Sequence, residues 1–224
     1  MKKITLLSII FLLIMAGCGS RPASTVSSLP ALASEWNLVI DKDFKNLSEP
    51  WCDDVSYSFG RFYCQEGEFH IKNESAGNIA TMTAGDFKNF KLEVLMRSLD
   101  NSGSYGVVFG VQDDAALYYL FRIRPSGQFQ LIKWSQAQPD LVLIPWTDSP
   151  AINKGLVSNQ LDVVVVGTQI RISINNEQVA ELMDTNFAHG SVGPVATEQG
   201  HAVINSMKVW ELNYRDGDLI HNLM

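Results

Sequence analysis

Aromatic, basic and amide side chains alternate along one short segment of this chain, in a pattern that suits a ligand with both flat apolar faces and hydroxyl groups. The residues are Tyr118, Arg122, Arg124, Gln128, Gln130 and Trp134. Aromatic rings stack on the C–H faces of sugars, and guanidinium and amide groups hydrogen-bond to hydroxyls. We therefore expect a carbohydrate-binding surface here, provided that these side chains reach the same side of a β-sheet.

A hairpin must position these side chains, and its predicted loop is Pro125-Ser126-Gly127. A type I turn followed by a glycine in the left-handed conformation makes a three-residue hairpin loop. The resulting register pairs Tyr118 with Trp134, Arg122 with Gln130, and Arg124 with Gln128. The opposite side of the hairpin is more apolar and is expected to face the core. A second loop at residues 113–115 adds the preceding strand to the same arrangement.

The same face also allows a purely structural interpretation. Val108, Leu120 and Ile132 form an apolar stripe along its middle, which a loop or the N-terminal segment could cover. Gly106 and Gly110 are expected on this face as well, and glycine in a strand often marks the close approach of a ligand or of another backbone. The sequence leaves both interpretations open.

The N-terminus has the features of an export signal. Two lysines precede an apolar run that ends at Cys18 and is shorter than the roughly 20 residues of a membrane-spanning helix. The stretch Met-Ala-Gly-Cys resembles a bacterial lipobox, so we expect a signal peptide at residues 1–17 and a lipid on Cys18. Residues 18–34 are rich in Ser, Ala and Pro and are expected to be a tether. A soluble secreted form stays open, because the first lipobox position is Met instead of Leu.

Charge limits the partners of the exported chain. The formal net charge is −7 and becomes −9 when the two N-terminal lysines are removed. This balance argues against nucleic acid and anionic membrane surfaces, so membrane contact is expected only through the lipid anchor. Gly19 after the cysteine resembles the pattern of lipoproteins sent to the outer membrane. We expect that location in a cell with an outer membrane, and the outer face of the plasma membrane otherwise.

Two residue pairs are candidates for stabilising the domain. Cys52 and Cys64 are the only other cysteines, and in an exported chain they are expected to form a disulfide worth about 3 kcal/mol. Asp41 and Asp43 alternate and could give oxygens to a structural Ca²⁺, which takes six to eight such ligands. Closely spaced aspartates are also common turn formers. No other cofactor is expected.

Apolar residues recur with period two along most of the chain, as in β-strands. The strand-like runs cover residues 35–41, 61–65, 67–72, 90–98, 105–112, 117–124, 128–134, 160–167, 169–175, 178–183 and 204–212. Turn residues such as Gly167-Thr168 and Asn175-Asn176 separate them. We expect one all-β domain at residues 35–213, an antiparallel jelly-roll β-sandwich, followed by a polar tail at residues 214–224.

The order of strands and turns resembles the bacterial laminin-G-like jelly rolls of the concanavalin A-like lectin/glucanase superfamily. The similarity is carried by YGVVFGVQDDAALYYLFRI, QLDVVVVGTQIRISINNEQVA and DTNFAHGSVG. The sequence also resembles, within this superfamily, the group that includes the 3-keto-disaccharide hydrolase domain. This resemblance covers roughly residues 41–212, and it implies that the concave sheet is a common place for sugar binding. It implies less about activity, because function on such scaffolds depends on the individual site.

Catalytic motifs are missing from the sequence. Glucanases of the resembled superfamily carry paired acids in a Glu-x-Asp-x-Glu type of spacing, which this chain lacks. Its histidines are His70, His189, His201 and His221; no two have metal-ligand spacing, and His189 is expected at the surface. We therefore expect a module that binds a polysaccharide or oligosaccharide without cleaving it. The alternatives are a glycoside-processing enzyme of the 3-keto-disaccharide hydrolase type and a protein-interaction or envelope-assembly module.

Overall fold

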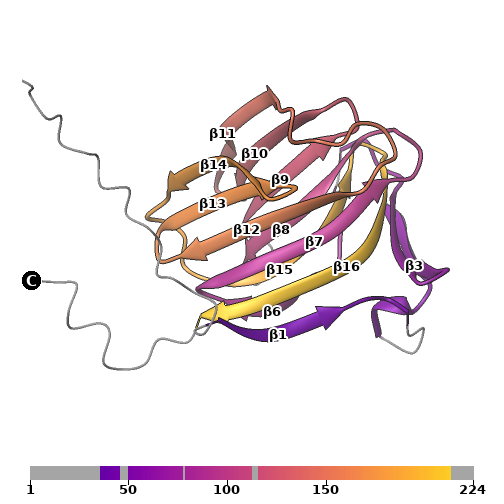
Figure 1. The fold of residues 1–224 in the computed structure, drawn as a ribbon, viewed down its shortest axis with the longest axis horizontal. Helices are drawn as coiled ribbons and strands as arrows, with labels where there is room; N and C mark the ends of the chain where they lie inside the picture. Colours follow the sequence, from indigo (N-terminus) through magenta and orange to yellow (C-terminus); the bar gives the residue numbers. More distant parts are fainter. Residues whose placement is uncertain (1–35, 46–49, 78, 113–115, 213–224) are drawn as a thin grey trace, which may run out of the picture. The chain divides into compact units, whose positions relative to one another are not determined.

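The protein is an all-β sandwich of antiparallel sheets, as the sequence predicts (Figure 1). The computed structural model describes residues 36–45, 50–77, 79–112 and 116–212. Helical structure in these ranges is limited to one 3-10 turn, η1 (Pro50–Cys52). Nothing in the described ranges forms a helix of the length and hydropathy needed to span a bilayer.

Several predictions concern residues outside the described ranges. These are the signal peptide at residues 1–17, the lipidated Cys18 with its tether at residues 18–34, the loop at residues 113–115, and the tail at residues 214–224. They stay predictions. The described part of the domain runs from residue 36 to residue 212.

The strands form a nine-stranded sheet, sheet A, and a seven-stranded sheet, sheet B. Sheet A has the order β14 (Glu177–Met183), β13 (Gln169–Ile174), β12 (Asn159–Val166), β7 (Phe90–Ser98), β16 (His201–Leu212), β4 (Glu68–Asn73), β3 (Gly60–Gln65) and β2 (Val55–Tyr57), with β1 (Trp36–Lys42) also paired to β16. Sheet B has the order β11 (Gln138–Asp148), β10 (Gln128–Ser135), β9 (Leu117–Arg124), β8 (Ser104–Val111), β15 (Gly190–Thr197) and β5 (Ala80–Thr81), with β6 (Ala84–Phe87) also paired to β15.

The core lies between the two sheets, because alternate side chains of each strand point inward. Leu92 and Val94 of β7 in sheet A belong to the same buried cluster as Phe121 and Ile123 of β9 in sheet B. All four side chains are fully buried. Burying each such side chain contributes roughly 1.5–3 kcal/mol, so the alternation seen in the sequence is the main source of the fold's stability.

The hairpin of β9 and β10 has the register that the sequence predicts. Its pairs are Tyr118 with Trp134, Arg122 with Gln130, and Arg124 with Gln128. Gly127 has a φ of 103°, and its N–H donates to the carbonyl of Arg124 at 2.9 Å, as the three-residue loop requires. β8 pairs with β9 as expected, with Val107 opposite Phe121.

Two strands that the sequence pattern did not predict, β11 and β15, complete the neighbourhood of this hairpin. Pro145 lies inside β11, and proline is tolerated there because β11 is an edge strand of sheet B. Gly193 and Pro194 interrupt the apolar alternation of β15, which lies between β8 and the short strands β5 and β6. Proline and glycine interrupt the period-two pattern of apolar residues, so the sequence pattern did not predict these two strands.

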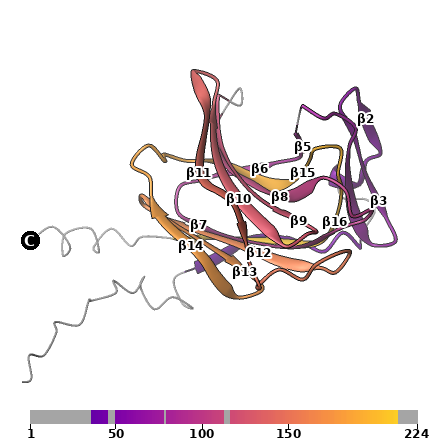
Figure 2. The same cartoon turned by 90° about the horizontal axis from the view of Figure 1, so that it is seen from above.

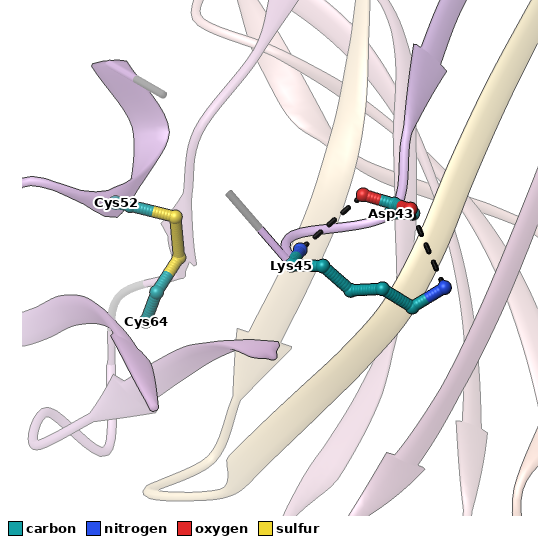
Figure 3. Close-up of a disulfide and its surroundings, with 4 residues drawn as sticks. All are labelled: Asp43, Lys45, Cys52 and Cys64. Atoms are coloured by element: carbon teal, nitrogen blue, oxygen red, sulfur yellow. Dashed lines mark hydrogen bonds and ion pairs between the residues drawn. A yellow bond between two sulfur atoms is a disulfide. The ribbon is translucent and has the colours of Figure 1, made fainter. Parts of the chain in front are cut away.

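The predicted disulfide between Cys52 and Cys64 is present (Figure 3). It joins η1 to β3, next to an aromatic cluster in which Trp51 packs 5.6 Å from Phe69 between ring centroids. The bond therefore ties the 3-10 turn η1 to β3, the strand next to the edge strand β2 of sheet A.

Candidate functional site

Tyr118 and Trp134 stack on each other on the outer face of sheet B, the face turned away from the core. Their ring centroids are 5.0 Å apart and the ring planes differ by 13°. Both side chains are partly exposed, and neither belongs to the main core cluster. The two rings thus form one aromatic platform, as the register requires.

A pocket of about 260 Å³ lies against this platform. The residues lining this platform pocket are Ala76, Gly77, Ile79, Tyr118, Leu120, Arg122, Ile132, Trp134, Asp140, Thr197 and Glu198. Figure 2 shows β10 and β11 rising along one side of sheet B. Asp140 of β11 borders the pocket on that side, and the segment before β5 borders it on the other. The volume is close to the lower end of ligand pockets, roughly 300–1,000 Å³.

Arg122 organises the polar end of the platform pocket. Its Nε and Nη2 donate to Oε1 of Gln130 at 3.0 and 2.8 Å. Its Nη1 donates to Thr197 Oγ1 at 3.1 Å and lies 3.2 Å from Glu198 Oε1. Burial lowers the pKa of Arg122 from its ordinary 12.5, an effect that Glu198 partly offsets. The guanidinium remains a charged donor at neutral pH.

Arg124, which packs on Trp146, is a second partner of Glu198. Nη2 of Arg124 lies 3.3 Å from each oxygen of Glu198, and its guanidinium carbon lies 3.8 Å from the centre of the Trp146 ring. Glu198 adopts a left-handed φ of 56° in the turn after β15. A carboxylate bound by two arginines is a fixed hydrogen-bond acceptor at the edge of the pocket.

Asp140 also lines the pocket, close enough for its charge to act on Tyr118 of the platform. Burial first, and then the charge of Asp140, raise the pKa of Tyr118 above its ordinary value of 10.0. The phenol is therefore protonated at neutral pH and can both donate and accept a hydrogen bond. The pocket offers an aromatic surface together with hydroxyl, carboxylate and guanidinium groups.

The six residues that the sequence predicted for this face have different roles. Tyr118, Arg122 and Trp134 line the platform pocket. Arg124 and Gln130 do not line it but contact Glu198 and Arg122, which do. Gln128 lies opposite Arg124 at the end of the hairpin.

Four polar or aromatic residues of the site were not predicted: Asp140, Trp146, Thr197 and Glu198. They lie on β11, on β15 or in the turn that follows β15. The sequence pattern had missed both of these strands. The acidic and aromatic residues in DLVLIPWTD and GPVATEQG were visible as types, but without the strands they could not be placed beside the hairpin.

Part of the apolar stripe is covered by chain, as the structural interpretation suggested. Val108, Leu120 and Val195 form a small buried cluster against which Ile79 packs. The expectation for the two glycines was partly wrong. A side chain at Gly106 would meet the β9 backbone, with Phe121 O at 2.1 Å, so neighbouring backbone explains this glycine. Gly110 has a φ of 60°, and a side chain there would point at Phe187 of the core instead of the outer face.

The predicted calcium ligands each face a lysine (Figure 3 shows Asp43 with Lys45). Asp43 Oδ2 lies 3.4 Å from Nζ of Lys45, and Asp41 Oδ1 lies 3.9 Å from Nζ of Lys208. Across the described ranges, no three His, Cys, Asp or Glu side chains come close enough to share a metal ion. The calcium hypothesis stays a prediction without support from this arrangement.

Two histidines that are far apart in the sequence meet on the outer face of sheet A. Nδ1 of His70 lies 3.2 Å from Nε2 of His201, and the Tyr63 ring stacks on His70 with 4.7 Å between centroids. Burial, followed by the charge of His70, lowers the pKa of His201 to about 4. Burial also lowers the pKa of His70. The pair is therefore neutral at physiological pH.

Because of this histidine pair, we expect the free energy of unfolding to fall in mild acid. As the pH falls below 6.5, the unfolded chain takes up the His201 proton before the folded chain does, so stability declines down to about pH 4. We expect a loss of about 2 kcal/mol, since one pKa unit is about 1.4 kcal/mol and the ring is partly screened. Urea unfolding between these pH values measures it, and His201→Gln should flatten the curve. Equal slopes for both proteins would contradict this assignment.

Comparison with known proteins identifies one matching family. The family model of the 3-keto-alpha-glucoside-1,2-lyase-like domain matches residues 34–216, which is most of the chain. No curated protein matches it.

Solved structures share the fold at low sequence identity. A Bacillus subtilis protein of unknown function with a galectin-like fold has a TM-score of 0.59 at 12% identity, covering 80% of this chain and 100% of that chain. The catalytic domain of an endo-1,3-beta-glucanase (laminarinase) from Thermotoga petrophila has a TM-score of 0.56 at 8% identity, covering 80% and 99%. These similarities confirm the concanavalin A-like jelly roll that the sequence predicts.

Proposed function

Since this chain belongs to the 3-keto-alpha-glucoside-1,2-lyase-like domain family, we propose that its platform pocket binds a saccharide. In this proposal the protein is an exported, lipid-anchored module of the cell envelope that holds a polysaccharide or oligosaccharide without cleaving it. The observation that carries the proposal is the stacked pair Tyr118–Trp134 at a pocket whose other end is polar.

Each part of the pocket suits one feature of a sugar ring. The aromatic platform provides a flat apolar surface for C–H groups. Arg122, Thr197 and Glu198 provide donors and acceptors for hydroxyls, and their mutual hydrogen bonds fix them before a ligand arrives. A preorganised site loses little conformational entropy on binding.

The ion pairs of Glu198 with two arginines favour binding of a saccharide over its hydrolysis. Glycoside hydrolysis needs one carboxyl group that gives up a proton and a second that acts as a base or nucleophile. Glu198 accepts hydrogen bonds from both Arg122 and Arg124, so its oxygens are already engaged as acceptors in the free protein.

The family supports a second candidate, a lyase acting on a 3-keto-glucoside. A C3 ketone acidifies the C2 proton of such a sugar, so a carboxylate base near C2 could eliminate the group at C1. Asp140 and Glu198 both line the pocket and are the available bases. Incubating the protein with a 3-keto-alpha-glucoside and following aglycone release tests this candidate. Release that stops in Asp140→Asn or Glu198→Gln would favour it over simple binding.

Trp134→Ala should weaken saccharide binding roughly thirty-fold, because a central aromatic anchor contributes about 2 kcal/mol or more. Tyr118→Ala should weaken it similarly, since it removes the other half of the platform. A glycan array identifies bound saccharides, and calorimetry on the best one measures the dissociation constant. Trp210→Ala is the matched control, because Trp210 lies on sheet A under Lys91. Unchanged binding in both platform variants would refute this site.

A further inference from the structure

A second pocket, the histidine pocket, lies around His189 and Asp86 at another part of sheet B. Its volume is about 380 Å³, larger than that of the platform pocket. The polar side chains lining it that matter here are Thr83, Asp86, Gln112, His189 and Ser191. They come from β6, β15 and the segments next to β5, β8 and β15, none of which forms the platform.

The two pockets share one face of the sheet. Val192 and Ala196 of β15 belong to the core, so Ser191 and Val195 point to the opposite, outer face. Val111 lines the histidine pocket and also packs against the cluster of Val108, Leu120 and Val195. Leu120 of that cluster lines the platform pocket. The small apolar cluster therefore lies between the two pockets.

A backbone irregularity shapes the histidine pocket. Ser191 pairs with Val111, but Gly193 pairs with Val108, so β8 has one extra residue between these pairs. Gly110 takes up the extra length with its left-handed φ of 60°. A bulge of this kind redirects the next side chain and is common beside binding sites. Here it turns Val111 onto the outer face.

His189 and Asp86 form an oriented polar pair in this pocket. Nδ1 of His189 lies 2.6 Å from Oδ1 of Asp86, and the two side chains are 58% and 66% exposed. Because Asp86 engages Nδ1, Nε2 is the ring nitrogen left to hydrogen-bond with a ligand. The hydroxyls of Thr83 and Ser191 and the amide of Gln112 add donors and acceptors nearby. The carboxylate and the net charge of −7 disfavour anions, so the chemistry fits a neutral ligand rich in hydroxyls.

We propose that the histidine pocket is a second saccharide-contacting site, and that the ligand is an extended oligosaccharide. The chain of sugars runs from the Tyr118–Trp134 platform across β8 and β15 to His189 and Asp86. The cluster of Val108, Leu120 and Val195 is buried, so in this proposal the middle sugars pass over the chain that covers it and make their main contacts at the two pockets. This inference rests on the proposed function and specifies the size of its ligand.

Affinity as a function of chain length tests this inference. The probes are gluco-oligosaccharides of the laminari-, cello- and malto- series, from two to six residues, titrated by calorimetry into the whole protein. For the series that binds, the wild-type affinity should rise with length. His189→Ala and Asp86→Ala should lower the affinity for the longest chain about ten-fold, the effect of losing a hydrogen bond to a polar pair, and should flatten the rise. Both side chains are more than half exposed, so the fold should tolerate these changes.

Two controls separate this inference from the proposed function. Glu74→Ala removes an exposed ion pair with Lys72 on sheet A and should keep the wild-type length dependence. Trp134→Ala should weaken binding at every length. Binding that depends on Trp134 but not on chain length or His189 would overturn the second site and leave the proposed function standing. No binding of any saccharide on the array would overturn both.

Discussion

Asp184→Asn should lower the free energy of unfolding by about 3–5 kcal/mol, because it leaves a buried charge without its partner. Nζ of Lys133 lies 2.7 Å from Oδ2 of Asp184, and these side chains are only 10% and 11% exposed. The hydroxyl of Tyr119 donates to the same oxygen at 2.8 Å. Asparagine keeps an acceptor for Tyr119 but removes the charge that Lys133 needs. Urea unfolding followed by tryptophan fluorescence measures the loss.

The acid behaviour of this pair has a definite direction. Burial raises the pKa of Asp184, but hydrogen bonds from Lys133, the Asn186 backbone and Tyr119 outweigh it, and the pKa ends below 3.8. The stability that the carboxylate contributes is therefore complete above about pH 3.8 and is lost as the pH falls through the lowered pKa. Measurements at pH 7 report the full effect.

A double variant distinguishes a buried charge from simple loss of packing. Asp184→Asn combined with Lys133→Met removes both charges and should be more stable than Asp184→Asn alone. Glu181→Gln, in the more exposed ion pair with Arg171, is the control and should change stability by less than about 1 kcal/mol. A double variant that is less stable than the single one would contradict the role assigned to the pair.

Arg122→Leu should weaken saccharide binding about 100-fold, or roughly 2.7 kcal/mol. The side chain is only 13% exposed and holds Gln130, Thr197 and Glu198 at the polar end of the pocket. Without it, Glu198 keeps Arg124 as its charged partner but loses its position beside the platform. Arg122 thus both lines the pocket and positions its neighbours, and calorimetry with the best saccharide measures the loss.

Two further arginine variants distinguish an effect on the pocket from an effect on the stability of the fold. Arg122→Lys keeps the charge but not the planar fork, so it should recover only part of the affinity. Arg61→Leu removes an exposed arginine that pairs with Asp54 on sheet A, and it should bind as the wild type does. Thermal unfolding checks that the affinity changes without collapse of the fold. Wild-type affinity in Arg122→Leu would show that this end of the pocket is not used.

Local sequence rules predicted the hairpin because its side-chain order repeats with the period of the strand. Pro125-Ser126-Gly127 determines the loop, and the loop determines every pair from Arg124–Gln128 to Tyr118–Trp134. A shift of one residue would have moved Phe121 and Leu131 out of the core, so the register has little freedom.

The rest of the site depends on contacts between distant segments. Glu198 meets Arg122 although 76 residues separate them, and His70 meets His201 over a separation of 131. The strands that bring Asp140, Trp146 and Glu198 to the hairpin contain Pro145, Gly193 and Pro194, which weaken the period-two pattern. Strict alternation had placed Gly110 on the outer face of sheet B. The bulge at this residue turns its side-chain position toward the core instead.

The amino-acid sequence by itself determined the all-β class, the disulfide partners, and the two aromatic rings that share one face. These properties follow from alternation, turn chemistry and composition, which act over a few residues. Only the tertiary structure decided which carboxylates complete the pocket, which part of the face is covered by Ile79, and where the histidine pocket lies. Those outcomes depend on how the strands order themselves within each sheet, and that order comes from packing across the whole core.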